Sequence, residues 1–285
     1  MKILRVKKRE LKLEDYIKRS ALPSDYSTLI TEPTTLVDDE TGEVLFAYFE
    51  EDWDTSDIVE VLKRTKYSVG KRARGLLSRS RIFGYRPRLA LRADFCSSTS
   101  LATEDPKGHA VVCSYAEKIE QKYLQGDPSV YTKHKAIVNE KVKANYRING
   151  TVFTSGIINK NNPLKYHFDT GNFNNVFSCM LVFKSGVTGG HLSLPEYDLG
   201  VELKNNSLFM FDGQGILHGV TPIKYASPLS YRYSVVYYSL KNIWQCLEVT
   251  EELARVRKKK TEREKIRHNM PKEHREYLKS RYGKQ

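Results

Sequence analysis

Short apolar runs broken by glycine and proline dominate the chain after residue 150 and predict strands. Residues 151–158, 207–211 and 231–240 are rich in aromatic and β-branched side chains, and residues 176–183 are almost wholly apolar. Aromatic and β-branched residues are typical of strands. A continuous apolar run is typical of a central strand that is buried on both faces. The pattern therefore favours a double-sheet jelly roll over residues 151–240.

The first half of the chain shows a helical pattern in two places. Apolar residues recur near helical spacing in residues 111–125, and residues 136–146 are again amphipathic, so both segments are expected to be helices. Residues 44–49 form an apolar and aromatic run that predicts a strand. Asp57 predicts the capped start of a short helix. Residues 1–43 are expected to contain a short helix or strand and loops.

The end of the chain is strongly basic. Residues 241–285 carry fourteen lysines and arginines against seven glutamates. Glu251 and Glu252 lie where the start of a helix favours anions, and residues 255–260 continue a basic helix that Pro271 interrupts. Such a helix fits an arm that lies along phosphates, and it fits equally well a solubilising helix held across the domain.

Together these segments predict an α+β protein. One domain is expected over residues 1–240, with the jelly-roll core at 151–240, an N-terminal part at 1–150 and supporting helices, followed by a basic helical tail at 241–285. A chain of 285 residues can bury a full core, and 40% hydrophobic residues exclude wholesale disorder. No apolar run approaches the length of a membrane span, and no signal peptide is evident.

The four cysteines predict a reducing compartment. They are widely spaced and include no C-x-x-C pair, which argues against a zinc ribbon and against a disulfide framework. We therefore expect the protein in the cytoplasm or nucleus and not among secreted proteins. The four are Cys96, Cys113, Cys179 and Cys246.

Charge makes a polyanionic partner plausible. The net charge is +13, and residues 61–93 contain eleven basic residues and no acidic one. Tyr67, Phe83 and Tyr85 lie among them, and unstacked bases pack against aromatic rings and guanidinium planes. A solvated basic loop, or arginines paired with the acidic residues at 50–60, is the alternative. The candidate nucleic-acid contacts are Arg72, Arg74, Arg81, Arg86, Arg88 and Arg92.

A few polar residues of the predicted jelly-roll core are candidate metal ligands. His167 and Asp169 are two positions apart, so on a strand their side chains project from the same face. Together with His218 they form the two-histidine, one-carboxylate triad that binds non-haem Fe(II) and leaves coordination positions open. Arg232 and Ser234 follow, and the planar fork of an arginine suits a dicarboxylate co-substrate. A His-x-Asp pair alone occurs by chance, but the ordered set indicates a metal site.

This ordered set resembles the 2-oxoglutarate and Fe(II) dependent dioxygenases. The surrounding sequence is most similar to their TET/JBP group, which oxidises the 5-methyl group of pyrimidines in nucleic acid. The similarity is carried by residues 189–196, 209–213 and 218–222 and extends roughly over 151–240. Without the long insertions and the zinc-binding Cys-rich region of the animal enzymes, the chain is more similar to phage or microbial members.

The resemblance implies a role for each site residue. His167, Asp169 and His218 would bind Fe(II), Arg232 would hold the distal carboxylate of 2-oxoglutarate, and Ser234 would add a hydrogen bond. Oxygen is the other co-substrate, and succinate and CO₂ are released. Hydroxylation is favoured because Asp169 stands where related halogenating enzymes have a small residue. The two predicted helices also fit the helical layer that supports the sheet in this superfamily.

The expected substrate is 5-methylcytosine or thymine in DNA. A base inside a duplex cannot reach a buried iron, so a flipped or single-stranded base is implied. The alternative is a 2-oxoglutarate-dependent hydroxylase of a protein side chain, an amino acid or another small molecule, because part of the motif is shared with prolyl-hydroxylase-like enzymes. A nucleic-acid-binding module with a vestigial oxygenase core is a third possibility.

The remaining polar candidates have weaker patterns. His191 follows two glycines, where it either lines the pocket or is exposed. Asp212 precedes a glycine and is expected to form a turn. Four further histidines have no partner pattern and are expected at the surface. They are His109, His134, His268 and His274.

Overall fold

The strands of this computed structural model form two sheets and a two-stranded ribbon. Among the described residues, one sheet has ten strands and the other five; we call them the large sheet and the small sheet. Two candidate nucleic-acid contacts, Arg74 and Arg92, lie outside that description. The described residues are 1–72, 76–88, 95–274, 276 and 280.

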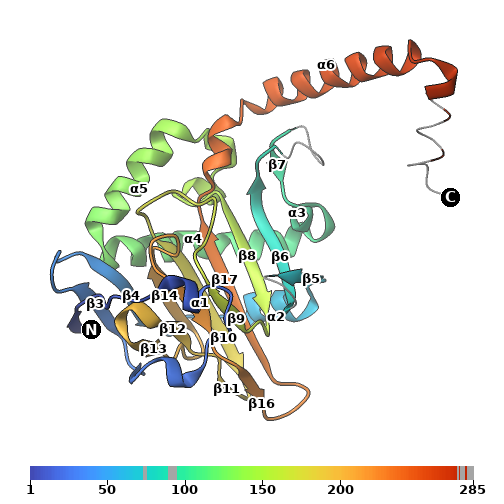
Figure 1. Ribbon diagram of the computed structural model, residues 1–285. Helices are drawn as coiled ribbons and strands as arrows, with labels where there is room; N and C mark the ends of the chain where they lie inside the picture. The colour runs from blue at the N-terminus through green and yellow to red at the C-terminus, as the bar shows by residue number, and fades with distance from the viewer. Residues whose placement is uncertain (73–75, 89–94, 275, 277–279, 281–285) are drawn as a thin grey trace.

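The large sheet combines strands from both halves of the chain (Figure 1). Its order is β1-β3-β4-β14-β10-β17-β8-β6-β5, and β7 pairs with β6. Because β4 pairs with β14 and β6 with β8, residues before and after position 150 share one sheet. The strands are β1 (Lys2–Val6), β3 (Thr34–Asp38), β4 (Val44–Glu50), β5 (Ser68–Arg72), β6 (Leu76–Arg86), β7 (Ser97–Ser98), β8 (Ser155–Lys160), β10 (Ser178–Ser185), β14 (Ser207–Phe211) and β17 (Tyr231–Tyr238).

The small sheet is built from shorter strands in the order β2-β13-β12-β15-β9. The ribbon pairs β11 with β16. The segments in these layers are β2 (Thr28–Ile30), β9 (Leu164–His167), β12 (Leu192–Leu194), β13 (Leu199–Val201), β15 (His218–Val220), β11 (Val187–Gly189) and β16 (Ile223–Tyr225).

Most of the predicted strands are confirmed, with shifted ends. The strand at 207–211 is β14, those at 176–183 and 231–240 overlap β10 and β17, and that at 44–49 lies within β4. The strand expected at 151–158 begins only at Ser155, as β8. Within the basic segment 61–93, β5 and β6 replace the loop that was one alternative.

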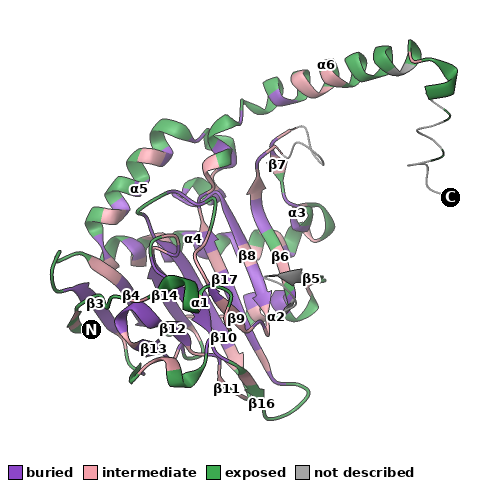
Figure 2. Cartoon of the chain, viewed as in Figure 1, coloured by how far each residue is buried: buried purple, intermediate pink, exposed green. Residues whose placement is uncertain are grey.

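Alternating side chains of the large sheet enter two different cores. Leu181 of β10 and Met210 of β14 belong to the core shared with the helices. Their neighbours Val182 and Phe209 belong to the core that also contains residues of the small sheet. Since successive residues of a strand point to opposite faces, one apolar strand such as β10 supplies both cores. Figure 2 shows the buried residues gathered along these central strands.

Two long helices, α4 (Pro106–Gly126) and α5 (Pro128–Lys141), pack against the helix-facing core. The predicted helix at 111–125 lies within α4. The second helix begins at Pro128 and not at 136, because Asp127 caps it through the amides of Ser129 and Val130. The shorter helices are α1 (Leu13–Tyr16), α2 (Ser56–Arg64) and α3 (Ser100–Glu104), and single 3₁₀ turns lie at 23–25, 144–146, 148–150, 195–197 and 241–245.

Asp57 does not cap α2 as predicted. The helix already begins at Ser56, and Asp57 lies inside its first turn. Its carboxylate instead accepts a hydrogen bond of 2.6 Å from the hydroxyl of Tyr115 in α4. This residue therefore connects two helices and does not start one.

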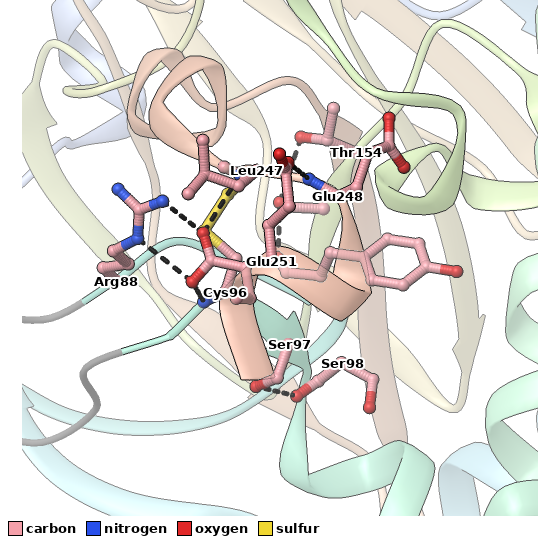
Figure 3. Close-up of a disulfide and its surroundings, with 12 residues drawn as sticks. Arg88, Cys96, Ser97, Ser98, Thr154, Leu247, Glu248 and Glu251 are labelled. Atoms are coloured by element: carbon pink, nitrogen blue, oxygen red, sulfur yellow. Dashed lines mark hydrogen bonds and ion pairs between the residues drawn. A yellow bond between two sulfur atoms is a disulfide. The ribbon is translucent and has the colours of Figure 1, made fainter. Parts of the chain in front are cut away.

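One cysteine pair corrects the expectation of no disulfide framework. Cys96 and Cys246, 150 residues apart in the sequence, are joined by a disulfide, whereas Cys113 and Cys179 are buried thiols. Spacing along the chain gave no sign of this pair, because the fold brings the start of β7 next to the residues that precede the last helix (Figure 3).

The predicted basic helix of the tail is confirmed as α6 (Val249–His268). It leaves the body of the protein and runs past β7 (Figure 1). It is therefore not held across the domain, as one alternative had it. The domain boundaries at 240 and 241 stay a prediction. No helix in the described part of the chain is long and apolar enough to cross a membrane.

Candidate metal centre

The three predicted metal ligands meet at the edge where β9 and β15 pair. His167, the last residue of β9, lies directly opposite His218, the first residue of β15, and Asp169 follows β9 by two residues. One ligand atom from each lies within 4.8 Å of the others. Asp169 Oδ1 is 3.6 Å from His167 Nε2 and 3.9 Å from His218 Nε2. The sheet register therefore places the two imidazoles side by side next to the carboxylate.

Backbone carbonyls orient both histidines in the same way. The Nδ1 of His167 lies 2.8 Å from the carbonyl of Lys165, and the Nδ1 of His218 lies 3.0 Å from that of Ile216. A carbonyl only accepts hydrogen bonds, so each Nδ1 carries the proton and each Nε2 keeps its lone pair for a metal. Burial lowers the pKa of His218 to about 4, which keeps the imidazole neutral at physiological pH.

The loop after β14 holds Asp169 in place. The amide of Asp169 donates to the carbonyl of Gly213 at 2.8 Å. A side chain at position 213 would place its Cβ only 2.4 Å from Asp169 Oδ2, so the glycine permits this close approach. Asp212 accepts from the amide of Gln214 at 3.0 Å, which is consistent with its predicted role as a turn former.

Arg232 and Ser234 project from β17 into the same cavity as the three metal-ligand candidates. The cavity has a volume of about 460 Å³. Arg232 is only 3% exposed, and its Nη2 has no hydrogen-bond partner among the described residues. Burial lowers its pKa to about 10, so the guanidinium is still charged at neutral pH. A buried charge without a partner is costly, and this one fits a carboxylate ligand.

The sequence did not predict the two asparagine side chains, Asn159 and Asn162, that lie along the cavity wall. The Nδ2 of Asn159 donates to Ser234 Oγ at 3.4 Å, and Asn162 donates to Asn159 Oδ1 at 3.3 Å and to Ser78 Oγ at 3.2 Å. All four residues line the cavity. The one available signal was that Asn159 is a polar residue that directly follows the apolar pair Ile157 and Ile158 in β8.

The candidate nucleic-acid contacts that the structure describes differ in their interactions with other residues of the protein. Arg81 pairs with Glu104 at 2.7 Å, and Arg88 pairs with the buried Glu252. The guanidinium of Arg86 lies 5.8 Å from the ring centre of Phe95. Arg72 belongs to β5 at the edge of the large sheet. Two of these arginines therefore form internal ion pairs.

The other histidines differ in part from expectation. His134, expected at the surface, is fully buried, and burial lowers its pKa to about 3. Its Nε2 lies 2.9 Å from Ser239 Oγ. The hydroxyl of Ser239 donates its own hydrogen bond to the carbonyl of Val152. His109 is half-buried and accepts from the amide of Gly84 at 3.0 Å. His268 and His274 are exposed, as predicted.

His191 belongs to the small-sheet side of the molecule. Its Nδ1 lies 2.6 Å from the hydroxyl of Tyr26, and its amide donates to Thr221 Oγ1 at 2.9 Å. The described residues that line the cavity do not include it. The first bond ties the residue before β12 to the N-terminal segment and the second ties it to the residue after β15, so His191 has a role in packing.

Comparisons with known proteins agree with this geometry. The family model Tet_JBP, described as the oxygenase domain of the 2OGFeDO superfamily, matches residues 91–241, which include all three metal-ligand candidates, Arg232 and Ser234. No curated protein matched the chain.

Two solved structures are similar to the chain. NgTET1 in complex with 5mC DNA has 17% identity and a TM-score of 0.57, with 86% of this chain and 84% of that chain covered. An oxidoreductase of the 2OG-Fe(II) oxygenase family from Burkholderia pseudomallei has 12% identity and a TM-score of 0.44, with 69% and 86% covered. The first likeness shows the fold.

Proposed function

The chain belongs to the Tet_JBP family of 2-oxoglutarate and Fe(II) dependent dioxygenases, and from this membership we propose that it hydroxylates the 5-methyl group of a pyrimidine in DNA. The base would be 5-methylcytosine or thymine. The family uses Fe(II), 2-oxoglutarate and O₂, and a His-Asp-His cluster is present to hold the metal. We also infer that the small sheet and the facing strands of the large sheet form the double-stranded β-helix expected from the sequence.

The residues present fit the iron. Two imidazoles present Nε2 beside one carboxylate oxygen, which is the ligand set that binds non-haem Fe(II). His167, Asp169 and His218 would hold the metal. Iron bound there would activate O₂, whose reduction couples decarboxylation of 2-oxoglutarate to hydroxylation of a C–H bond. Because each Nδ1 donates a hydrogen bond to a backbone carbonyl, each imidazole would coordinate the metal through Nε2.

Arg232 and Ser234 would bind the co-substrate. The buried guanidinium would pair with the distal carboxylate of 2-oxoglutarate, and the Ser234 hydroxyl would donate to the same group. Asn159 contacts Ser234 and so orients that hydroxyl. Because Arg232 and Ser234 are buried, water would be excluded from the bound carboxylate, and this strengthens the charge-assisted hydrogen bonds.

DNA is supported as the substrate by the net charge of +13 and by the likeness to a structure that was solved with 5mC DNA. The single observation that carries the proposed chemistry is the shared cavity. The metal-ligand candidates and Arg232 line one space of about 460 Å³, which has the size of a small-molecule or base pocket. A base would have to leave the helical stack to enter it.

Nucleoside mass spectrometry tests the proposal. The purified protein is incubated with Fe(II), 2-oxoglutarate and ascorbate on DNA that contains both thymine and 5-methylcytosine. We expect one base to gain one oxygen with wild-type protein and with the control Asp39→Asn, an exposed carboxylate. We expect no gain with Asp169→Ala. Succinate release without any change in the DNA would contradict DNA as the substrate but would still support the oxygenase chemistry.

A further inference from the structure

Helix α6 stands apart from the other helices because most of it does not pack on the protein. Figures 1 and 2 show it leaving the domain beyond β7, with an exposed surface along its length. Glu252 in its first turn is buried. From Arg257 to His268 the described side chains are exposed, apart from the half-buried Lys259. Its first two turns are therefore the root, and the rest projects into solvent.

Three segments of the chain fix this root. The Glu252 carboxylate accepts hydrogen bonds from Arg88, from the amide of Cys96 at 3.2 Å and from the amide of Leu247 at 3.0 Å. The disulfide between Cys96 and Cys246 lies beside them (Figure 3). Arg88, a candidate DNA contact in the sequence, therefore serves as an anchor for the helix.

The projecting part of α6 is polar on every side. Residues 257–268 carry seven lysines and arginines against two glutamates. Beyond the root the helix has one large apolar residue, Ile266, which is 64% exposed. A membrane-surface helix needs a continuous apolar face, and a helix that pairs with another helix needs an apolar stripe. With neither present, the surface is complementary to a polyanion.

We propose that α6 is an arm that binds the phosphate backbone of DNA next to the target base. The identification of DNA rests on the proposed function. From Arg257 to His268 the helix is about 18 Å long, and over that distance duplex DNA presents on the order of ten phosphates. Because the contacts of Glu252 anchor the root and the helix is already formed, the arm needs less ordering on binding, which lowers the entropic cost of association.

Full-length protein and fluorescence anisotropy test the arm. Binding to a labelled duplex is measured over a series of salt concentrations for wild-type protein and for the variant Arg257→Gln, Lys258→Gln, Lys265→Gln. These three side chains are exposed, and glutamine keeps the helix propensity. We expect affinity at intermediate salt to fall on the order of tenfold or more, and each lost phosphate contact to flatten the log–log salt slope by about 0.9.

A matched variant separates the arm from net charge. Lys107→Gln, Lys133→Gln, Lys141→Gln removes the same charge from exposed positions on α4 and α5. We expect this control to keep nearly the whole salt slope. An equal loss of DNA affinity in the two triple variants would contradict the proposed role of α6 and indicate a general charge effect. Circular dichroism of both variants, with unchanged helix content, shows that folding is intact.

The outcomes also distinguish the arm from the proposed chemistry. If DNA is bound through α6 but no base is oxidised, the arm stands and the substrate proposal fails. If a base is oxidised while the α6 variant binds like wild-type protein, the arm fails and the chemistry stands. Wild-type protein that prefers RNA, or vesicles of phosphatidylcholine and phosphatidylserine, over the DNA duplex would overturn the arm.

Discussion

Arg232 carries a clear expectation at the scale of single residues. Replacement by lysine keeps the charge but loses the planar fork that pairs with a carboxylate. A charge-assisted hydrogen bond contributes about 1.5–3 kcal/mol, so the concentration of 2-oxoglutarate needed for half-maximal succinate release should rise about ten- to a hundredfold. Arg79→Lys, an exposed arginine, is the control. An unchanged requirement would place the co-substrate elsewhere.

Gly213 gives a second expectation because of its contact with a metal-ligand candidate. In Gly213→Ala the new Cβ would lie 2.4 Å from Asp169 Oδ2, so the carboxylate must move. Displacing a ligand through its supporting shell typically costs about 10- to 100-fold in metal affinity. Anaerobic calorimetric titration with Fe(II) measures the loss. Gly70→Ala, with no atom within 4 Å of the new Cβ, should bind as wild-type protein does; a comparable loss there would point to a general effect.

The sequence predicted part of this site because strand geometry is local. A period of two predicted His167 and Asp169 side by side, although only His167 lies on β9 and Asp169 is held beyond the strand end by its bond to Gly213. The amides of Asn159 and Asn162 were not predicted, because their partners come from β6 and β17, far away in the sequence. His134 was misjudged for a different reason. It follows Tyr131 on the buried face of α5, but the helix was expected to begin only at 136.

At the scale of elements, Glu252 holds α6 to the domain, and its protonation should control that attachment. Burial raises the pKa of the Glu252 carboxyl, but hydrogen bonds from Arg88, Leu247 and Cys96 lower it by more, so the pKa lies below its ordinary value. A lowered pKa stabilises the fold above the pKa of the unfolded state. That stabilisation is lost as the pH falls through the folded pKa.

Glu252→Gln tests this attachment by urea unfolding. Breaking a buried ion pair costs about 3 kcal/mol, so the variant should be less stable at pH 7 by roughly that amount. The difference between variant and wild-type protein should shrink at acidic pH, where the wild-type carboxylate is protonated too. Glu262→Gln on the exposed part of α6 should change little. A deficit that is independent of pH would indicate a packing effect instead.

Element types were easier to predict than element ends. The apolar runs predicted β10, β14 and β17, because a buried strand needs such residues wherever it pairs. The start of α5 depended on one local cap at Asp127, which lay outside the periodic segment. The strands β5 and β6 were not predicted, since eleven basic residues in 61–93 obscured their alternation.

At the scale of the whole molecule, pairing between distant segments decides the architecture. β4 joins β14, and β6 joins β8, so strands from residues 1–150 extend the sheet that carries Arg232 on both sides. Such pairings bring together segments that the sequence separates, and no local pattern encodes them. Residues 1–150 are therefore expected to fold together with the core and not as a separate unit.

The last prediction concerns the disulfide, which joins the residue before β7 to the residues that precede α6. Cys96 and Cys246 lie 150 residues apart in the sequence, and closing a loop of this length stabilises a fold by about 3–5 kcal/mol in the chain-entropy model. Reduction should therefore lower the unfolding temperature of the wild-type protein. Cys96→Ser should show a similarly low temperature and no further change with reductant, and Cys113→Ser should keep the response to reductant. Four titratable thiols in protein that was never reduced would contradict the disulfide.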